Sequence, residues 1–76
     1  MDKGWVLRVT AVEPGIRVGT STMSYEYRGI TDPNHTCRDP RRLAVGDVVT
    51  VKNLTATSVL VTGCCGCDYL LWDLVS

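Results

Sequence analysis

Apolar and polar residues alternate with a period of two along most of this chain. In residues 5–12 every second position is apolar, namely Trp5, Leu7, Val9 and Ala11. Because successive side chains of a strand point to opposite faces, this pattern predicts an extended strand with one face buried. Weaker versions of the pattern occupy residues 16–20 and 23–28, so the first part of the chain predicts three short strands.

The second half of the chain repeats the pattern with stronger strand formers. Residues 48–52 are mostly β-branched, and residues 58–62 follow after a short polar connection, so the two segments predict a hairpin. Between the halves, residues 31–46 contain two prolines and lack any alternation, which predicts a long loop. Irregular stretches of this length are uncommon in compact domains and are usually functional or anchored.

The last segment, residues 68–75, fits two interpretations. Leu70, Trp72 and Leu74 alternate as in a strand, whereas Asp68 is also a suitable N-cap for a short helix. We favour the strand, because a helix this short is only marginally stable by itself.

Five to six short strands with turn residues between them predict an all-β fold, either a small barrel or a sandwich of antiparallel strands. At residues 13–15 the sequence Glu-Pro-Gly predicts such a turn, in which proline sets φ and glycine accepts a positive φ. Residues 45–51 resemble the hairpin entry of many oligonucleotide-binding-like and SH3-like small barrels. This resemblance implies a barrel and implies no function, since such folds carry many functions. The length predicts one domain, residues 1–76.

Composition narrows the classes of function. Hydrophobic residues make up 45% of the chain and charged residues 21%, a balance typical of a folded globular domain. Eight basic residues balance eight acidic ones, so the chain lacks the basic excess that a dedicated nucleic-acid binder uses against phosphates. No segment has the apolar run of a signal peptide or a membrane span, so we expect a cytoplasmic protein without membrane contact.

The four cysteines offer the sharpest candidate site. Cys64 and Cys67 have the C-x-x-C spacing with which one turn presents two thiolates to a tetrahedral ion, and His35 and Cys37 lie in the long loop. These four residues predict a structural zinc site, zinc being the one cofactor that the sequence indicates. One alternative is a disulfide from Cys37 to Cys64 or Cys67, which requires an oxidising compartment. The simplest alternative is that the cysteines are free thiols, partly buried as small apolar side chains.

A second candidate site combines three arginines of the long loop with two tyrosines of a predicted strand. Its members, predicted as partner-binding residues, are Arg38, Arg41, Arg42, Tyr25 and Tyr27. Guanidinium groups bind phosphate or carboxylate in a planar geometry, and aromatic rings anchor contacts with proteins or stack on bases. The simpler alternative places the arginines in a solvated loop and the tyrosines in the core, and the zero net charge favours it.

Enzymatic activity is the least supported function. The chain has a single histidine and no glycine-rich phosphate loop, and a domain this small leaves little volume for a cleft beside its core. We expect a non-catalytic adaptor that binds a protein partner, either another protein or a second copy of the chain. Phage and mobile-element accessory factors, such as inhibitors of host complexes or virion assembly components, are proteins of this kind. The alternatives are a nucleic-acid-binding barrel that uses the arginine loop and a zinc-stabilised structural module.

Overall fold

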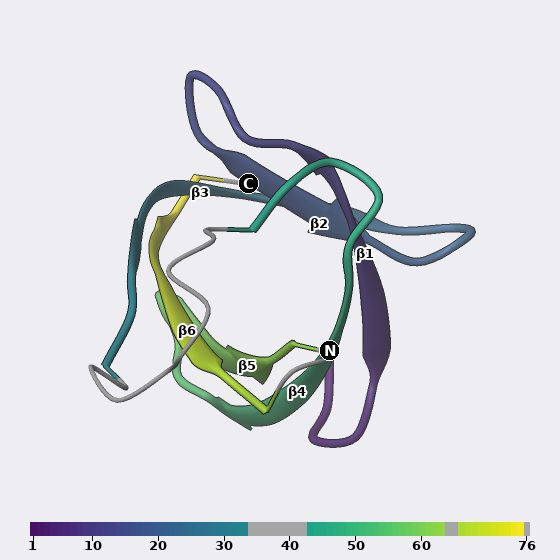
Figure 1. Cartoon of the computed structure of the whole chain (residues 1–76), viewed down its shortest axis with the longest axis vertical. Coiled ribbons are helices and arrows are strands. Elements are labelled where there is room, and N and C mark those ends of the chain that lie inside the picture. Colours follow the sequence, from purple (N-terminus) through teal and green to yellow (C-terminus); the bar gives the residue numbers. More distant parts are fainter. Residues whose placement is uncertain (34–42, 64–65, 76) are drawn as a thin grey trace.

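Six antiparallel strands form a closed barrel in the computed structural model, which describes residues 1–33, 43–63 and 66–75 (Figure 1). The strands are β1 (Val6–Ala11), β2 (Ile16–Gly19), β3 (Ser24–Thr31), β4 (Val48–Leu54), β5 (Ser58–Thr62) and β6 (Asp68–Leu74). The all-β prediction is therefore confirmed, and its barrel form is the one adopted. The C-terminal segment is a strand, as its alternation favoured.

The order of strands around the barrel is β1-β2-β3-β6-β5-β4. Each half of the chain forms a three-stranded meander, and the two meanders meet where β3 pairs with β6 and where β1 pairs with β4. Because both seams are hydrogen-bonded, the sheet closes on itself and exposes no long free edge. Closure also explains why β3 continues to Thr31: its last residues pair with β6, which the local pattern in residues 23–28 did not reveal.

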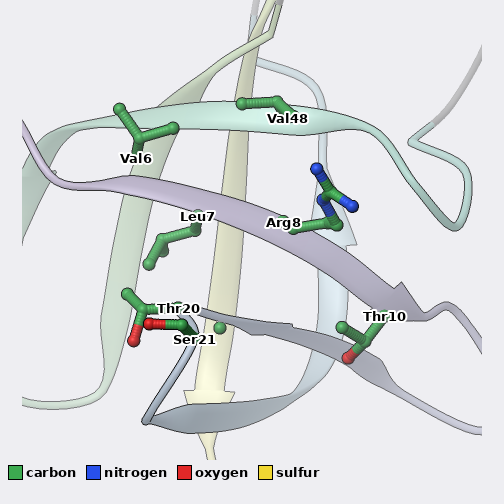
Figure 2. A pocket seen from close by; sticks show the side chains of 8 residues that line it. Val6, Leu7, Arg8, Thr10, Thr20, Ser21 and Val48 are labelled. Carbon is green, nitrogen blue, oxygen red and sulfur yellow. The ribbon is translucent and has the colours of Figure 1, made fainter.

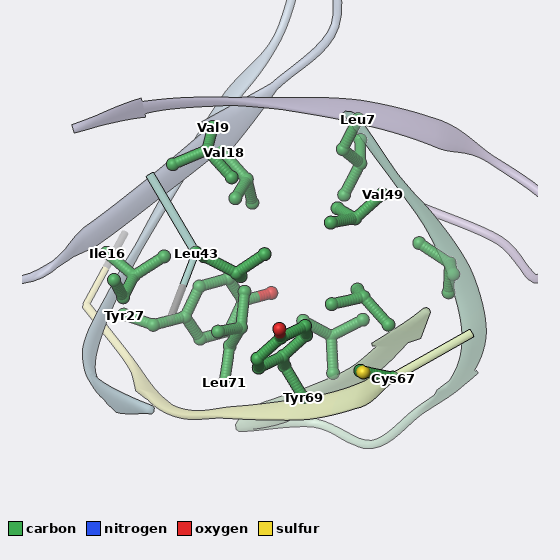
Figure 3. Close-up of a cluster of buried hydrophobic side chains, with 13 residues drawn as sticks. Leu7, Val9, Ile16, Val18, Tyr27, Leu43, Val49, Cys67, Tyr69 and Leu71 are labelled. Carbon is green, nitrogen blue, oxygen red and sulfur yellow. The ribbon is translucent and has the colours of Figure 1, made fainter. Parts of the chain in front are cut away.

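The barrel interior is filled by apolar side chains from all six strands and by Leu43 and Cys67, which lie outside the strands (Figure 3). Its buried members are Leu7, Val9, Ile16, Val18, Tyr27, Leu43, Val49, Val51, Val59, Val61, Cys67, Tyr69 and Leu71. Alternation places these side chains inward, since every second residue of a strand points to the same face. No buried polar or charged residue lies among the described residues, so packing and apolar burial stabilise this core.

The turn at residues 13–15 differs from the prediction. Gly15 does not have a positive φ, and the Glu13–Pro14 peptide bond is cis. Gly15 is instead required by a close approach, because a Cβ there would overlap the backbone carbonyl oxygen of Tyr27 on β3. Positive φ occurs at Gly46, in the turn before β4, where the backbone N–H of Ala44 donates to Asp47 Oδ2 at 2.9 Å.

A polar cluster lies across β4, β5 and β6 on the outer wall. Thr62 Oγ1 donates to Asp68 Oδ1 at 2.8 Å, and Lys52 Nζ donates to Asp68 Oδ2 at 3.1 Å. The hydrogen bond from Thr62, followed by the bond and charge of Lys52, lowers the pKa of Asp68. The carboxylate of Asp68 therefore remains ionised and bonded down to acidic pH, which holds the three strands in register on this side.

Candidate docking groove

Two valines are exposed side by side on the outer wall of the barrel. Val6 on β1 is 59% exposed and Val48 on β4 is 45% exposed. Val48 lies directly across from Arg8 in the β1–β4 register, and Val6 is two residues before Arg8 on the same face of β1. The three side chains therefore form one outward patch in which an arginine stands beside two apolar groups.

This patch borders a groove of about 410 Å³ on the outside of the barrel (Figure 2). The groove lies between β1, the start of β4 and the β2–β3 hairpin, and it is lined by Val6, Leu7, Arg8, Thr10, Gly19, Thr20, Ser21 and Val48. Figure 2 shows Val6, Arg8 and Val48 on one side, with Thr20 and Ser21 of the hairpin on the other. Among the described residues of the lining, Arg8 is the only charged one.

The β2–β3 hairpin creates this groove by turning away from β1. Its turn is held by three bonds: the N–H of Thr20 donates to Met23 O at 2.8 Å, and Thr20 Oγ1 accepts from the N–H groups of Thr22 and Met23. Gly19 makes the tight turn feasible, because a Cβ there would overlap the carbonyl oxygen of Met23. The pairing of β2 with β1 ends at the Gly19–Arg8 pair, so the first residues of β1 have no β2 neighbour.

The groove carries an uncompensated positive charge. Arg17 on β2 pairs with Glu26 at 3.2 Å, and Lys52 pairs with Asp68 at 3.1 Å. Arg8, by contrast, has no ion pair or side-chain hydrogen bond with any residue in the described part of the chain. An arginine on a β-sheet surface with no internal role is available to a carboxylate or phosphate of another molecule.

Trp72 is also exposed, and its exposure has a structural explanation within the barrel. Its ring lies against Gly29 on the neighbouring strand, where a Cβ would overlap the indole, and its Nε1 donates to Thr31 Oγ1 at 2.9 Å. A ring that covers a strand glycine in this way supports the sheet. The exposure of Trp72 is therefore explained within the barrel, whereas the exposure of Val6 and Val48 is not.

The tyrosines predicted as partner-binding residues take different places. Tyr27 is 3% exposed and lies in the core, where burial and then the charge of Tyr25 raise the pKa of its hydroxyl. It presents no surface to a partner, in agreement with the simpler alternative. Tyr25 is half-buried against the core, and its hydroxyl donates to Met23 Sδ at 3.5 Å.

Most of the predicted chemistry falls outside the described residues. Arg38, Arg41 and Arg42 lie there, as do His35, Cys37 and Cys64 of the predicted zinc site. Among the residues that the structure describes, no three histidine, cysteine or acidic side chains form a cluster suited to a metal ion. The zinc site and the arginine surface therefore stay predictions.

Cys67 is the one cysteine that the structure describes. It is 4% exposed, and its sulfur lies at the wall of the core near Tyr69 (Figure 3). Cys67 is disulfide-bonded, and its partner lies outside the described residues, so the predicted pairing with Cys37 stays a prediction. A sulfur in a disulfide is not a thiolate, so the predicted zinc site requires the reduced form of the chain.

A count of free thiols tests this arrangement directly. One disulfide consumes two of the four cysteines, so we expect at most two reactive thiols in protein that is purified and denatured without reductant. The measurement is a colorimetric thiol titration in denaturant, with a fully reduced sample as its control. Four reactive thiols would contradict the disulfide and return the cysteines to the zinc or free-thiol interpretation.

Sequence reasoning missed the groove, although a signal was present. Val6 and Val48 occupy positions that alternate with the core residues Leu7 and Val49, so both are apolar residues at outward positions. Arg8 also occupies a polar, outward position of the alternating pattern. What the sequence lacked was the register that brings Val48 beside Arg8.

No family model, no curated protein and no solved structure matches this chain. The described residues include no helix long and apolar enough to cross a membrane. The function is therefore argued from the barrel itself.

Proposed function

We propose that this barrel is a non-catalytic contact module that binds a protein partner through the groove beside β1. The observation that carries the proposal is the patch of Val6, Arg8 and Val48, in which two exposed valines adjoin an arginine without a partner in the described structure. Protein interfaces favour this combination, because arginine is enriched at energetic centres and the apolar neighbours exclude water from it.

The binding free energies expected from these residues fit a modest but specific contact. Covering the exposed parts of Val6 and Val48 would contribute about 1 kcal/mol each, by the area of apolar surface removed from water. A charge-assisted hydrogen bond from Arg8 would add about 1.5–3 kcal/mol once the groove is covered. These contributions favour a site that binds a small number of residues of the partner. The rest of the barrel holds this site in place.

Capture experiments with two matched variants test the proposal. Immobilised barrel is exposed to a lysate of the cells that produce it, and the retained proteins are identified by mass spectrometry. Val48→Asp places a carboxylate in the apolar part of the groove, so we expect it to lose the protein that the wild type retains. Leu54→Asp makes a similar change at an exposed position of β4 outside the groove lining, and it should retain that protein.

Two results would contradict the proposal. One is retention of the same proteins by the wild type and by Val48→Asp, which would place the contact elsewhere. The other is a loss in both variants, which would point to damage of the barrel rather than to a contact. Circular dichroism of each variant confirms that the strands remain folded before the comparison is made.

A further inference from the structure

The backbone of β1 has an open side at Val6. The N–H of Val9 donates to Asp47 O at 2.8 Å, and the carbonyl of Trp5 accepts from Val51 N–H at 2.9 Å, so odd-numbered residues of β1 face β4. Backbone groups of successive strand residues point to opposite sides, and Val6 and Arg8 therefore face β2. Arg8 meets Gly19 there, but β2 ends at that residue.

The continuation of that register would bring Ser21 opposite Val6. Ser21 instead lies in the turn that the bonds between Thr20 and Met23 hold together. No backbone hydrogen bond joins Val6 to the hairpin within the described structure. The N–H and C=O of Val6 thus face the groove without a partner, in the place where one more strand residue would pair.

Three features of this groove therefore favour the same kind of ligand. The open backbone groups of Val6 suit a peptide in extended conformation, since such a segment offers N–H and C=O groups to the side of a strand. The exposed side chains of Val6 and Val48 suit an apolar residue of that peptide. The charge of Arg8 suits a carboxylate, and it is the only charge in the described part of the lining.

We propose that the groove binds an extended acidic segment of a partner protein, with one carboxylate on Arg8 and one apolar side chain against Val6 and Val48. This inference rests on the proposed function and names the chemistry of its partner. Val6 and Arg8 lie two positions apart on the same outward face of β1, so both side chains can contact one bound segment.

A random peptide library displayed on phage tests the inference without knowledge of the natural partner. Selection on the wild-type barrel should enrich peptides that carry aspartate or glutamate close to an apolar residue. Arg8→Glu should weaken the binding of these peptides about tenfold to a hundredfold, and a peptide in which the acidic residue is replaced by lysine should recover binding to that variant. Arg28→Glu is the matched control, because Arg28 is also exposed and unpaired but does not line the groove.

Amide exchange measured by NMR tests the extended conformation of the bound peptide. The N–H of Val6 should exchange rapidly in the free protein and at least about tenfold more slowly in the complex, since a hydrogen bond protects it only there. The N–H of Val9 is already bonded to Asp47 and should change little. Unaltered exchange at Val6 in a saturated complex would overturn the extended mode of binding.

The remaining outcomes separate this inference from the proposed function. Enriched peptides that depend on Val48 but are neutral or basic, and that bind Arg8→Glu equally well, would overturn the inference and leave the proposed function standing. A dimer of the chain that Val48→Asp abolishes would also overturn it, because the groove would then bind a second copy. A selection that enriches no groove-dependent peptide would overturn it as well, and the capture experiment would decide the proposed function by itself.

Discussion

Replacing Leu71 with alanine is expected to remove most of the free energy of unfolding of this protein. Leu71 is fully buried on β6 and is among the largest side chains of the core. A buried leucine truncated to alanine costs about 2–5 kcal/mol, because contacts are lost and a cavity remains. The core of a domain this small seldom supplies more than about 3–5 kcal/mol, so a single truncation removes most of the free energy of unfolding.

The adjacent residue provides the control for this substitution. Leu70 points to the outer wall, where it is only half-buried and pairs with Leu60. Leu70→Ala should therefore cost clearly less than Leu71→Ala in urea unfolding followed by circular dichroism. Equal losses of the free energy of unfolding in the two variants would contradict the assignment of Leu71 to the inner side and Leu70 to the outer side of β6. They would thereby contradict the closed barrel.

Replacing Gly19 with alanine is expected to produce the second-largest loss and to alter the groove. The new Cβ would overlap the carbonyl oxygen of Met23, which is a backbone atom of the hairpin turn and cannot rotate away. Relief requires the β2–β3 hairpin to shift, at a cost of about 1–3 kcal/mol for overpacking and more if the turn opens. Thermal unfolding and the binding of a groove-selected peptide should both change.

Gly63→Ala is the matched control for Gly19→Ala. A Cβ at Gly63 would meet Tyr69 Cε2 at 3.4 Å, an ordinary contact with a side chain, and Gly63 lies outside the groove. We expect a small change in stability and none in peptide binding. A Gly19→Ala variant as stable as Gly63→Ala would show that the hairpin adapts freely and that its position does not define the groove.

Local alternation predicted the strands of this protein well because it reflects a local constraint. A strand with one buried face must place an apolar residue at every second position, and segments such as residues 5–12 and 58–62 carry that requirement in their own sequence. At residues 68–75 alternation also predicted the strand, but its alternating residues Leu70 and Trp72 lie on the outer side, and the buried residues are Tyr69 and Leu71. These segments could therefore be assigned as strands without knowing which segments pair with them.

The candidate site was less accessible from the sequence because its parts are distant in the chain. The prediction of functional sites relied on residue types that commonly bind ligands, namely the arginine cluster and the cysteines. Most of these residues lie outside the described part of the chain. The groove consists instead of ordinary residues whose significance depends on their neighbours. Val6 is only an exposed valine until Val48 lies beside Arg8 in the adjacent strand.

The sequence by itself determined which segments are strands, that the face of Leu7 and Val9 is a buried one, and that no long helix was required. The tertiary structure alone decided that the two meanders close into a barrel, that β2 leaves β1 at Gly19, and that Val48 lies beside Arg8, which has no ion pair with any described residue. The physical reason is that alternation acts within a segment, whereas register and closure depend on hydrogen bonds and packing between segments far apart in the chain.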